Sequence, residues 1–261
     1  MQASRDENFL YTLQITADGS PTLILENPDA SEMTASEAMH NSAGALTESI
    51  YIYYENILEA SRRGWPCNVL SVGLGLGYNE ALTAVSKIRS QVLNSPLIFS
   101  FEKNPTIRSQ YKSWLTRNAV SEKSFWTEAF DQTLIAPAEK FSIDPEAIKK
   151  VLIDLYKEKC FRLESDFLDY KSKISGQRFT SILFDAFSKK STPGLWDESF
   201  LANFLSDCAD KNCILTSYAA TGTLNRALAK NGFCNTRRSG FQGKRESTWA
   251  ERVEETPQTS L

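Results

Sequence analysis

The chain has very little histidine and no cysteines at the close spacing of a metal site. Its one histidine, His40, excludes a multi-histidine metal site, and any Ser-His-Asp triad would have to use it. The cysteines are five in number, and no two have Cys-x-x-Cys spacing: Cys67, Cys160, Cys208, Cys213 and Cys234. This odd set argues against a disulfide scaffold or a zinc ribbon. We therefore expect free thiols in a reducing compartment and a cytoplasmic protein.

Long hydrophobic runs and an excess of positive charge are also missing. No run approaches the roughly 18 apolar residues that span a membrane, and residues 1–8 contain no apolar signal segment. With 29 Lys and Arg against 32 Asp and Glu, the net charge of −3 excludes nucleic-acid binding through overall positive charge. A local basic patch stays possible. The 261 residues, 41% of them hydrophobic, suffice for one large domain or two small ones.

The order of strand and helix signals predicts an α/β fold. Residues 9–25 predict a β-hairpin and residues 47–63 a helix. Further along, strand signals at 67–72, 97–101, 180–184, 213–218, 233–238 and 245–249 alternate with helix signals at 78–92, 105–118 and 223–231. This alternation is typical of a Rossmann-like, doubly wound, mostly parallel sheet with an antiparallel end.

One stretch interrupts the alternation. Residues 119–158, with a helix signal from 144 to 159, are predicted to be a helical insertion. We expect an N-terminal hairpin and helix extension over residues 1–58 and a core domain over residues 59–249 that contains the insertion. A loose tail is expected over residues 250–261, which are rich in Glu, Thr, Pro and Gln.

A glycine-rich turn follows the strand predicted at 67–72. Gly73, Gly75 and Gly77 allow the backbone to turn sharply and to approach a ligand beside the free N–H groups of a helix start. The spacing is Gly-x-Gly-x-Gly, whereas nicotinamide and flavin sites typically have Gly-x-Gly-x-x-Gly. The turn therefore favours a cofactor without a pyrophosphate and makes a nicotinamide dehydrogenase a distant alternative.

Acidic residues stand where the next strands end. Glu102 ends the strand predicted at 97–101 and is placed to accept hydrogen bonds from both hydroxyls of a ribose. Asp166 is a candidate acceptor for an adenine amino group, and Asp185 ends the strand predicted at 180–184. The carboxyl ends of parallel strands line the ligand crevice of an open α/β sheet. The alternative is that Glu102 and Asp185 only cap helices.

Six segments carry a family resemblance, in the expected order between about residue 39 and residue 248. They are Met39–Ser49, Gly73–Asn79, Phe101–Pro105, Phe184–Trp196, Thr216–Leu228 and Gly240–Glu246. The glycine turn with its acids resembles class I S-adenosylmethionine-dependent methyltransferases. The other segments resemble a narrower family, the methyltransferase half of the MnmC-like tRNA wobble-uridine enzymes. The Asp-x-Phe…Trp and Gly-Phe-x-x-Lys-Arg-Glu segments are more specific than the glycine turn.

The resemblance implies methylation of 5-aminomethyl-(2-thio)uridine at the tRNA wobble position to 5-methylaminomethyl-(2-thio)uridine. It implies S-adenosylmethionine as cofactor, no metal and no flavin, and a stand-alone form of the methyltransferase half. The cofactor-binding residues it implies are Gly73, Gly75, Gly77, Asn79, Glu102, Asp166 and Glu48. One position departs from the family, where an acid usually stands two residues before the first glycine and Ser71 stands here.

The reaction implied by the resemblance needs a neutral amine, so a carboxylate that orients it and accepts its proton is expected. Asp185 is the candidate catalytic residue, and Phe187 and Tyr218 are candidates to stack on a flipped base, with core packing as the alternative. His40 is predicted to contact substrate or cofactor, although a lone histidine often only holds structure. The predicted substrate-binding cations are Lys189, Lys244 and Arg245, part of a proposed phosphate-binding patch with Lys190, Arg237 and Arg238.

Two other functions remain open from the sequence. An aminopropyltransferase shares this fold, but it needs several acids around Asp185, where the chain has Phe187, Ser188, Lys189 and Lys190. A non-catalytic nucleotide-binding or tRNA-binding module is the other, and Ser71 makes it plausible. Measuring whether the protein binds S-adenosylmethionine and turns it over separates the three functions.

Overall fold

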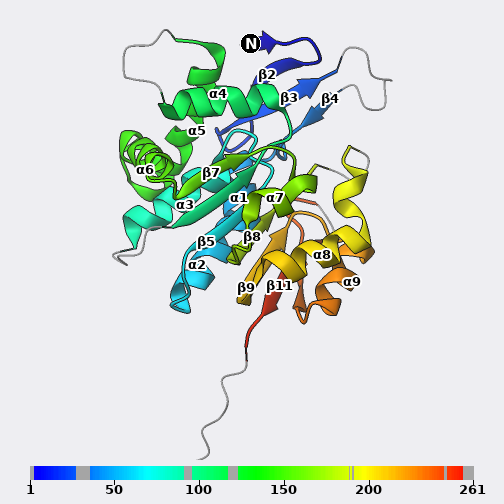
Figure 1. Ribbon diagram of the computed structural model, residues 1–261. Helices are drawn as coiled ribbons and strands as arrows, with labels where there is room; N and C mark the ends of the chain where they lie inside the picture. The colour runs from blue at the N-terminus through cyan, green and yellow to red at the C-terminus, as the bar shows by residue number, and fades with distance from the viewer. Residues whose placement is uncertain are drawn as a thin grey trace, which may run out of the picture.

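The computed structural model describes residues 3–27, 36–90, 96–116, 123–187, 189, 191–243 and 246–254. Within these residues the strands form two sheets (Figure 1). The small antiparallel sheet has the order β1-β2-β3-β4, with strands Ala3–Arg5, Leu10–Ile15, Pro21–Glu26 and Ser36–Ala38. The predicted hairpin over 9–25 is its central pair, β2 and β3.

The large sheet has the strand order β10-β11-β9-β8-β5-β6-β7. Its strands are β5 Asn68–Val72, β6 Leu97–Phe101, β7 Phe161–Glu164, β8 Phe179–Phe184, β9 Ala209–Ser217, β10 Cys234–Ser239 and β11 Glu246–Arg252. Strands β9, β8, β5, β6 and β7 are parallel, whereas β11 runs antiparallel to both β9 and β10. The predicted mostly parallel sheet with an antiparallel end is confirmed. The sequence analysis missed β7, and β11 runs three residues into the predicted tail.

Alternation along the strands divides the core between the two faces of the large sheet. On β5, Val69 packs into one hydrophobic cluster and Leu70 into the other, and Ile98 and Phe99 of β6 divide in the same way. Both faces are therefore buried, as a parallel sheet with helices on each side requires. Strand residues on one face pack with α1–α6 and the small sheet, and those on the other face with α7–α9 (Figure 1).

Helices occur at the predicted positions between the strands, and the structure contains further helices that were not predicted. They are α1 Ala45–Ser49, α2 Glu55–Arg62, α3 Tyr78–Arg89, α4 Pro105–Thr116, α5 Phe125–Phe141, α6 Pro145–Lys157, α7 Tyr170–Ile174, α8 Glu198–Cys208 and α9 Gly222–Lys230. Short 3₁₀ segments η2 (Phe167–Asp169) and η3 (Pro193–Trp196) lie in loops. The predicted helix over 47–63 is a continuous run of α1, a π-helical segment η1 (Ile50–Tyr54) and α2. Hydrophobic periodicity did not indicate this change of helical pitch.

The predicted helical insertion consists of α5 and α6. Ser124 and Thr127 form a capping box at the start of α5, and Asp144 caps α6 before Pro145. The Asp-Pro signal was recognised in the sequence, whereas the Ser-Thr box was not. Helices α5 and α6 both pack on α3, and α5 also contacts β3, so the insertion joins the small sheet to the core (Figure 1).

The turn between β2 and β3 caps the start of α1. Backbone N–H groups of α1 donate to side-chain oxygens of this turn: Ala45 to Thr16, Leu46 to Ser20 and Thr47 to Asp18 (2.9 Å to Oδ2). These N–H groups have no partner inside the helix, so the hairpin supplies what the helix lacks. This contact fixes the position of α1.

Replacing Asp18 with Ala should therefore destabilise the fold by roughly 0.5–2 kcal/mol, the usual effect of losing a helix cap. Burial acts to raise the pKa of the Asp18 carboxyl, but hydrogen bonds from Ser20 and Thr47 outweigh it and lower the pKa to about 2. A lowered pKa gives stability that is present above about pH 4 and lost as the pH falls towards 2. Thermal unfolding at pH 7 and pH 3 measures both effects, with Asp18→Asn as the control that keeps an acceptor. An equal unfolding temperature for wild type and Asp18→Ala at pH 7 would contradict the capping role.

A search of the described residues for a helix long and apolar enough to cross a membrane finds none.

Candidate active site

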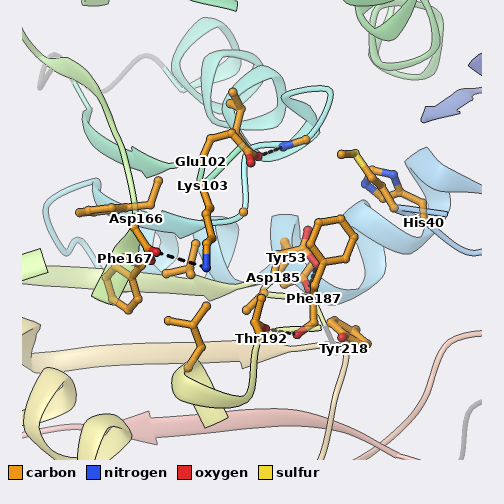
Figure 2. A pocket seen from close by; sticks show the side chains of 18 of the residues that line it. His40, Tyr53, Glu102, Lys103, Asp166, Phe167, Asp185, Phe187, Thr192 and Tyr218 are labelled. Carbon is orange, nitrogen blue, oxygen red and sulfur yellow. Dashed lines mark hydrogen bonds and ion pairs between the residues drawn. The ribbon is translucent and has the colours of Figure 1, made fainter. Parts of the chain in front are cut away.

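A cavity of about 380 Å³ opens at the carboxyl ends of the parallel strands (Figure 2). It adjoins the junction of β5 and β8, where the order of the sheet reverses, which is where open α/β sheets bind ligands. Of the predicted site residues, it brings together His40, Glu48, Gly73, Gly75, Glu102, Asp166, Asp185, Phe187 and Tyr218. These residues come from both the N-terminal segment and the sheet.

The glycine turn between β5 and α3 forms one wall of the cavity. Gly73 has φ +99° and Gly75 has φ +54°, a left-handed region that favours glycine. A Cβ at Gly73 would lie 2.4 Å from the backbone oxygen of Asp185, and one at Gly75 would lie 3.0 Å from Sδ of Met39. The absence of side chains therefore allows the turn to pack against the Asp185 loop.

Glu102 follows β6 and closes the wall beside the turn. Its carboxylate accepts hydrogen bonds from the backbone N–H groups of Gly75 (3.1 Å) and Asn104 (2.8 Å). Burial raises its pKa, and these two N–H groups act in the opposite direction. The carboxylate is 6% exposed and lines the cavity, so its remaining lone pairs are available to ligand hydroxyls.

Asp166 lies at the mouth of the cavity and already has two partners. Its Oδ1 accepts from the N–H of Leu168 at the start of η2, and its Oδ2 lies 3.4 Å from Nζ of Lys103 (Figure 2). Lys103, which the sequence analysis did not single out, also lines the cavity, and its side chain is 67% exposed. Because exposed ion pairs contribute little to stability, Lys103 can move away from Asp166 with little loss of free energy.

Asp185, at the end of β8, has a partner that the sequence analysis missed. The hydroxyl of Tyr53 donates to its Oδ1 at 2.6 Å, and both residues line the cavity (Figure 2). Tyr53 belongs to η1 and lies 132 residues away in the sequence. The three tyrosines between residues 51 and 54 were the available signal. Nothing in the sequence distinguishes a tyrosine that faces the cavity from a tyrosine that packs in the core.

The loop after Asp185 is fixed by side chains of the Asp-x-Phe…Trp segment. The backbone carbonyl of Phe187 accepts from the hydroxyl of Thr192 and from the indole N–H of Trp196, both at 2.8 Å. Trp196 is 1% exposed and packs against Phe184. Its role is to hold the loop that carries Phe187, which lines the cavity together with Tyr218 (Figure 2).

The segment before α1 closes the other side of the cavity. Nδ1 of His40 is 3.2 Å from the Thr22 hydroxyl, and its ring packs edge-on against Tyr78. Glu48, 4% exposed, accepts a hydrogen bond from the N–H of Asn41 at 2.8 Å. His40 is therefore held by structural contacts while it also lines the cavity.

Other predicted site residues lie elsewhere. Gly77 and Asn79 are absent from the described residues that line the cavity. A Cβ at Gly77 would lie 2.7 Å from the Tyr111 ring, so this glycine allows the turn before α3 to approach Tyr111 of α4. Lys189 is exposed and does not line the cavity. Lys190, Lys244 and Arg245 lie outside the described residues, as does the side chain of Arg237.

Arg238 does not fit the predicted phosphate patch. Its guanidinium pairs with Glu55 at 2.6 Å and stacks over the Tyr51 ring at 3.8 Å, and the side chain is 14% exposed. A phosphate would have to displace both partners. These contacts argue against the predicted phosphate contact, because pairs of basic residues in a sequence do not reveal which cations are already paired.

Beneath the glycine turn, Ser71 is buried on β5 next to a carboxyl that the sequence analysis did not use. Glu80 of α3 is 1% exposed and accepts a hydrogen bond from the Ser100 hydroxyl at 2.7 Å. Burial raises its pKa to about 7, and the hydrogen bond from Ser100 acts in the opposite direction. The core behind the turn therefore contains a carboxyl even though residue 71 is serine.

Comparison with known proteins agrees with this geometry. Residues 132–253 match the sequence model of a family described as S-adenosyl-L-methionine-dependent methyltransferase. The crystal structure of MnmC2 from Aquifex aeolicus has the same fold, with a TM-score of 0.63 and 23% identity over 94% of this chain and 72% of that one. In fold, in the position of the cavity and in the matched segment, the chain is similar to class I S-adenosylmethionine-dependent methyltransferases.

The narrower similarity is to MnmC. The tRNA 5-methylaminomethyl-2-thiouridine biosynthesis bifunctional protein MnmC of Burkholderia mallei is 24% identical over 214 residues, which cover 79% of this chain and 31% of that protein. The protein of the same name from Burkholderia thailandensis is 24% identical over 209 residues. The chain thus spans about a third of the length of these curated relatives. The resemblance to the MnmC-like family predicted from the motifs is confirmed.

The residues present fit the cofactor that this class uses. The glycine turn leaves space for close backbone approach, and the buried Glu102 carboxylate provides the acceptor that ribose hydroxyls need. Glu102→Ala should raise the dissociation constant for S-adenosylmethionine at least tenfold, because a hydrogen bond to a charged acceptor contributes roughly 1.5–3 kcal/mol. Calorimetry measures this, with Glu102→Gln as the control of similar shape and intermediate affinity. A change below twofold in Glu102→Ala would assign the residue to structure alone.

Proposed function

We propose that this protein transfers a methyl group from S-adenosylmethionine to the amine of 5-aminomethyl-(2-thio)uridine at the wobble position of tRNA, forming 5-methylaminomethyl-(2-thio)uridine. The observation that carries the proposal is the contact between Gly73 and the backbone of Asp185. If the glycine turn binds the cofactor, as we propose, this contact brings the cofactor close to a carboxylate suited to an amine substrate. The similarity to MnmC supports the choice of substrate.

In this proposal the cofactor occupies the side of the cavity formed by the glycine turn and Glu102. Gly73 and Gly75 lie against its methionine end and Glu102 accepts from its ribose. Asp166 faces the adenine once Lys103 moves aside, and Glu48 frames the methionine end. Gly77 and Asn79 support the turn from behind. When bound, S-adenosylmethionine supplies a methyl group activated by its sulfonium.

The acceptor amine must be unprotonated when it reacts, because only its lone pair can form the new N–C bond. An alkylamine is mostly an ammonium ion at neutral pH, so the site has to remove a proton as well as hold the group. Asp185 performs both tasks: its carboxylate accepts a hydrogen bond from the amine and then takes the proton. Phe187 and Tyr218 hold the uracil ring between them, because an enzyme acting on a base must take it out of its stack.

The wobble nucleotide reaches the cavity through the mouth near Lys103 and His40. Lys103 and the exposed Lys189 provide positive charge for anticodon phosphates. Lys190, Lys244 and Arg245, which lie outside the described residues, stay predicted phosphate contacts. The tRNA is therefore expected to bind less tightly as salt concentration rises. His40, which also lines the cavity, contacts the substrate.

A second candidate is transfer of a methyl or aminopropyl group to a small cationic amine. Four carboxylates line the cavity within the described residues: Glu48, Glu102, Asp166 and Asp185. This acidity suits a polyamine, and Lys189 does not line the cavity to oppose one. The motif similarity to MnmC favours the tRNA substrate.

The deciding experiment uses purified protein with methyl-labelled S-adenosylmethionine. The acceptors are tRNA carrying 5-aminomethyl-2-thiouridine, the same tRNA lacking the aminomethyl group, and putrescine with either S-adenosylmethionine or its decarboxylated form. We expect label only in the aminomethyl tRNA. Transfer to putrescine alone would favour the second candidate, and binding without any transfer would favour a non-catalytic module.

A further inference from the structure

The hydroxyl of Tyr53 occupies a position at the centre of the cavity's titratable groups. It donates to Oδ1 of Asp185 at 2.6 Å, while the residue itself is 1% exposed and lines the cavity. Burial raises the pKa of Tyr53 well above 10, and the charges of Asp185, Glu48 and Tyr218 raise it further. The hydroxyl therefore keeps its proton, and remains a donor, at neutral pH.

The local backbone explains why this tyrosine reaches Asp185. Tyr53 lies in the π-helical segment η1, and its neighbour Tyr54 points elsewhere, packing edge-on against Phe141 of α5. Helix α1, which leads into η1, is fixed at its start by the hairpin turn through Thr16, Asp18 and Ser20. The hydroxyl is thus held by a rigid series of contacts, and π-helical turns often occur at functional sites.

We propose that Tyr53 is a positioning residue for methyl transfer: it fixes the Asp185 carboxylate in one orientation and favours its ionised form. This inference rests on the proposed function of Asp185 as the group that orients the amine and takes its proton. A carboxylate that rotates freely, or that is protonated, cannot do either. A hydrogen bond donated to a carboxylate stabilises the charged form over the neutral one.

Tyr53→Phe removes this one hydroxyl and keeps the ring. Affinity for S-adenosylmethionine should stay within about twofold, because Gly73, Gly75 and Glu102 are unchanged. The single-turnover rate at pH 7 should fall about 10- to 100-fold, while the KM for tRNA changes little. The acid limb of the pH–rate profile should move to higher pH, so that part of the lost rate returns at alkaline pH.

Tyr54→Phe is the matched control. It removes the hydroxyl of an adjacent, equally buried tyrosine that is not among the described residues lining the cavity. Its rate and pH profile should match those of the wild type. A loss of rate in Tyr53→Phe that is the same at every pH, or an equal loss in Tyr54→Phe, would overturn the positioning role.

A double-mutant cycle gives a second test. In the Asp185→Asn background, Tyr53→Phe should have little further effect, because the group through which Tyr53 acts has gone. If the fold-loss of rate in the double variant equals the product of the losses in the two single variants, Tyr53 acts independently of Asp185, contrary to the proposal.

A readout without substrate separates this inference from the proposed function. Carboxyl ¹³C NMR of protein labelled at aspartate follows the protonation of Asp185 directly, and its signal is assigned by its loss in Asp185→Asn. In Tyr53→Phe the Asp185 signal should titrate at a higher pH than in the wild type. An unchanged titration would overturn the inference even if the protein methylates tRNA. A shifted titration in a wild type that methylates no aminomethyluridine would overturn the proposed function alone.

Discussion

Asp185→Asn should lower the single-turnover rate of methylation by about 10²- to 10⁴-fold, the range typical of a general base. The asparagine side chain keeps the size of the aspartate but cannot take a proton from the amine. The affinity for S-adenosylmethionine should change by no more than a few-fold, because the carboxylate of Glu102 and the glycine turn remain. The wild-type rate should rise with pH as Asp185 ionises and the amine becomes neutral, and then level off.

Rapid-quench assays with excess protein measure this rate, and calorimetry measures the affinity. A near-normal rate in Asp185→Asn would make Asp185 structural, leaving the positioning of the two substrates as the source of catalysis. A large loss of affinity together with the loss of rate would instead place Asp185 in cofactor binding.

Gly75→Val should abolish S-adenosylmethionine binding measurable by calorimetry while the fold persists. Gly75 has φ +54°, its N–H donates to Glu102, and it lines the cavity. A valine there is strained by roughly 1–2 kcal/mol, and its methyl groups occupy space next to Met39 that the cofactor needs.

Gly64→Val is the matched control for backbone strain. Gly64 follows α2 with φ +71°, and a Cβ there would meet nothing within 4 Å. Both variants have a strained backbone, and Gly75→Val also meets Met39, but only Gly75→Val should lose the cofactor. If Gly75→Val binds S-adenosylmethionine as the wild type does, the turn is not the cofactor site.

Much of this architecture could be predicted because the local signals are strong. Glycines with a left-handed backbone conformation, such as Gly73, are required wherever the strand must turn sharply into α3. Short apolar runs ending in an acid gave β6 with Glu102 and β8 with Asp185. The rule that carboxyl ends of parallel strands meet at one edge then placed these acids in a single crevice.

What the sequence did not predict depends on contacts between distant segments. Tyr53 is one of three tyrosines between residues 51 and 54, and only the fold places its hydroxyl beside Asp185. Arg238 looked available for phosphate, but the packing of β10 against η1 and α2 pairs it with Glu55 and Tyr51. Strand β7 was missed because its four residues are too short for a clear periodic pattern.

The proposed substrate can be tested most directly by mass spectrometry of tRNA nucleosides from a strain that lacks this gene. The account predicts that 5-aminomethyl-(2-thio)uridine accumulates, that 5-methylaminomethyl-(2-thio)uridine disappears, and that a plasmid carrying the wild-type gene restores it whereas Asp185→Asn does not. A nucleoside profile identical to that of the parent strain would contradict the account.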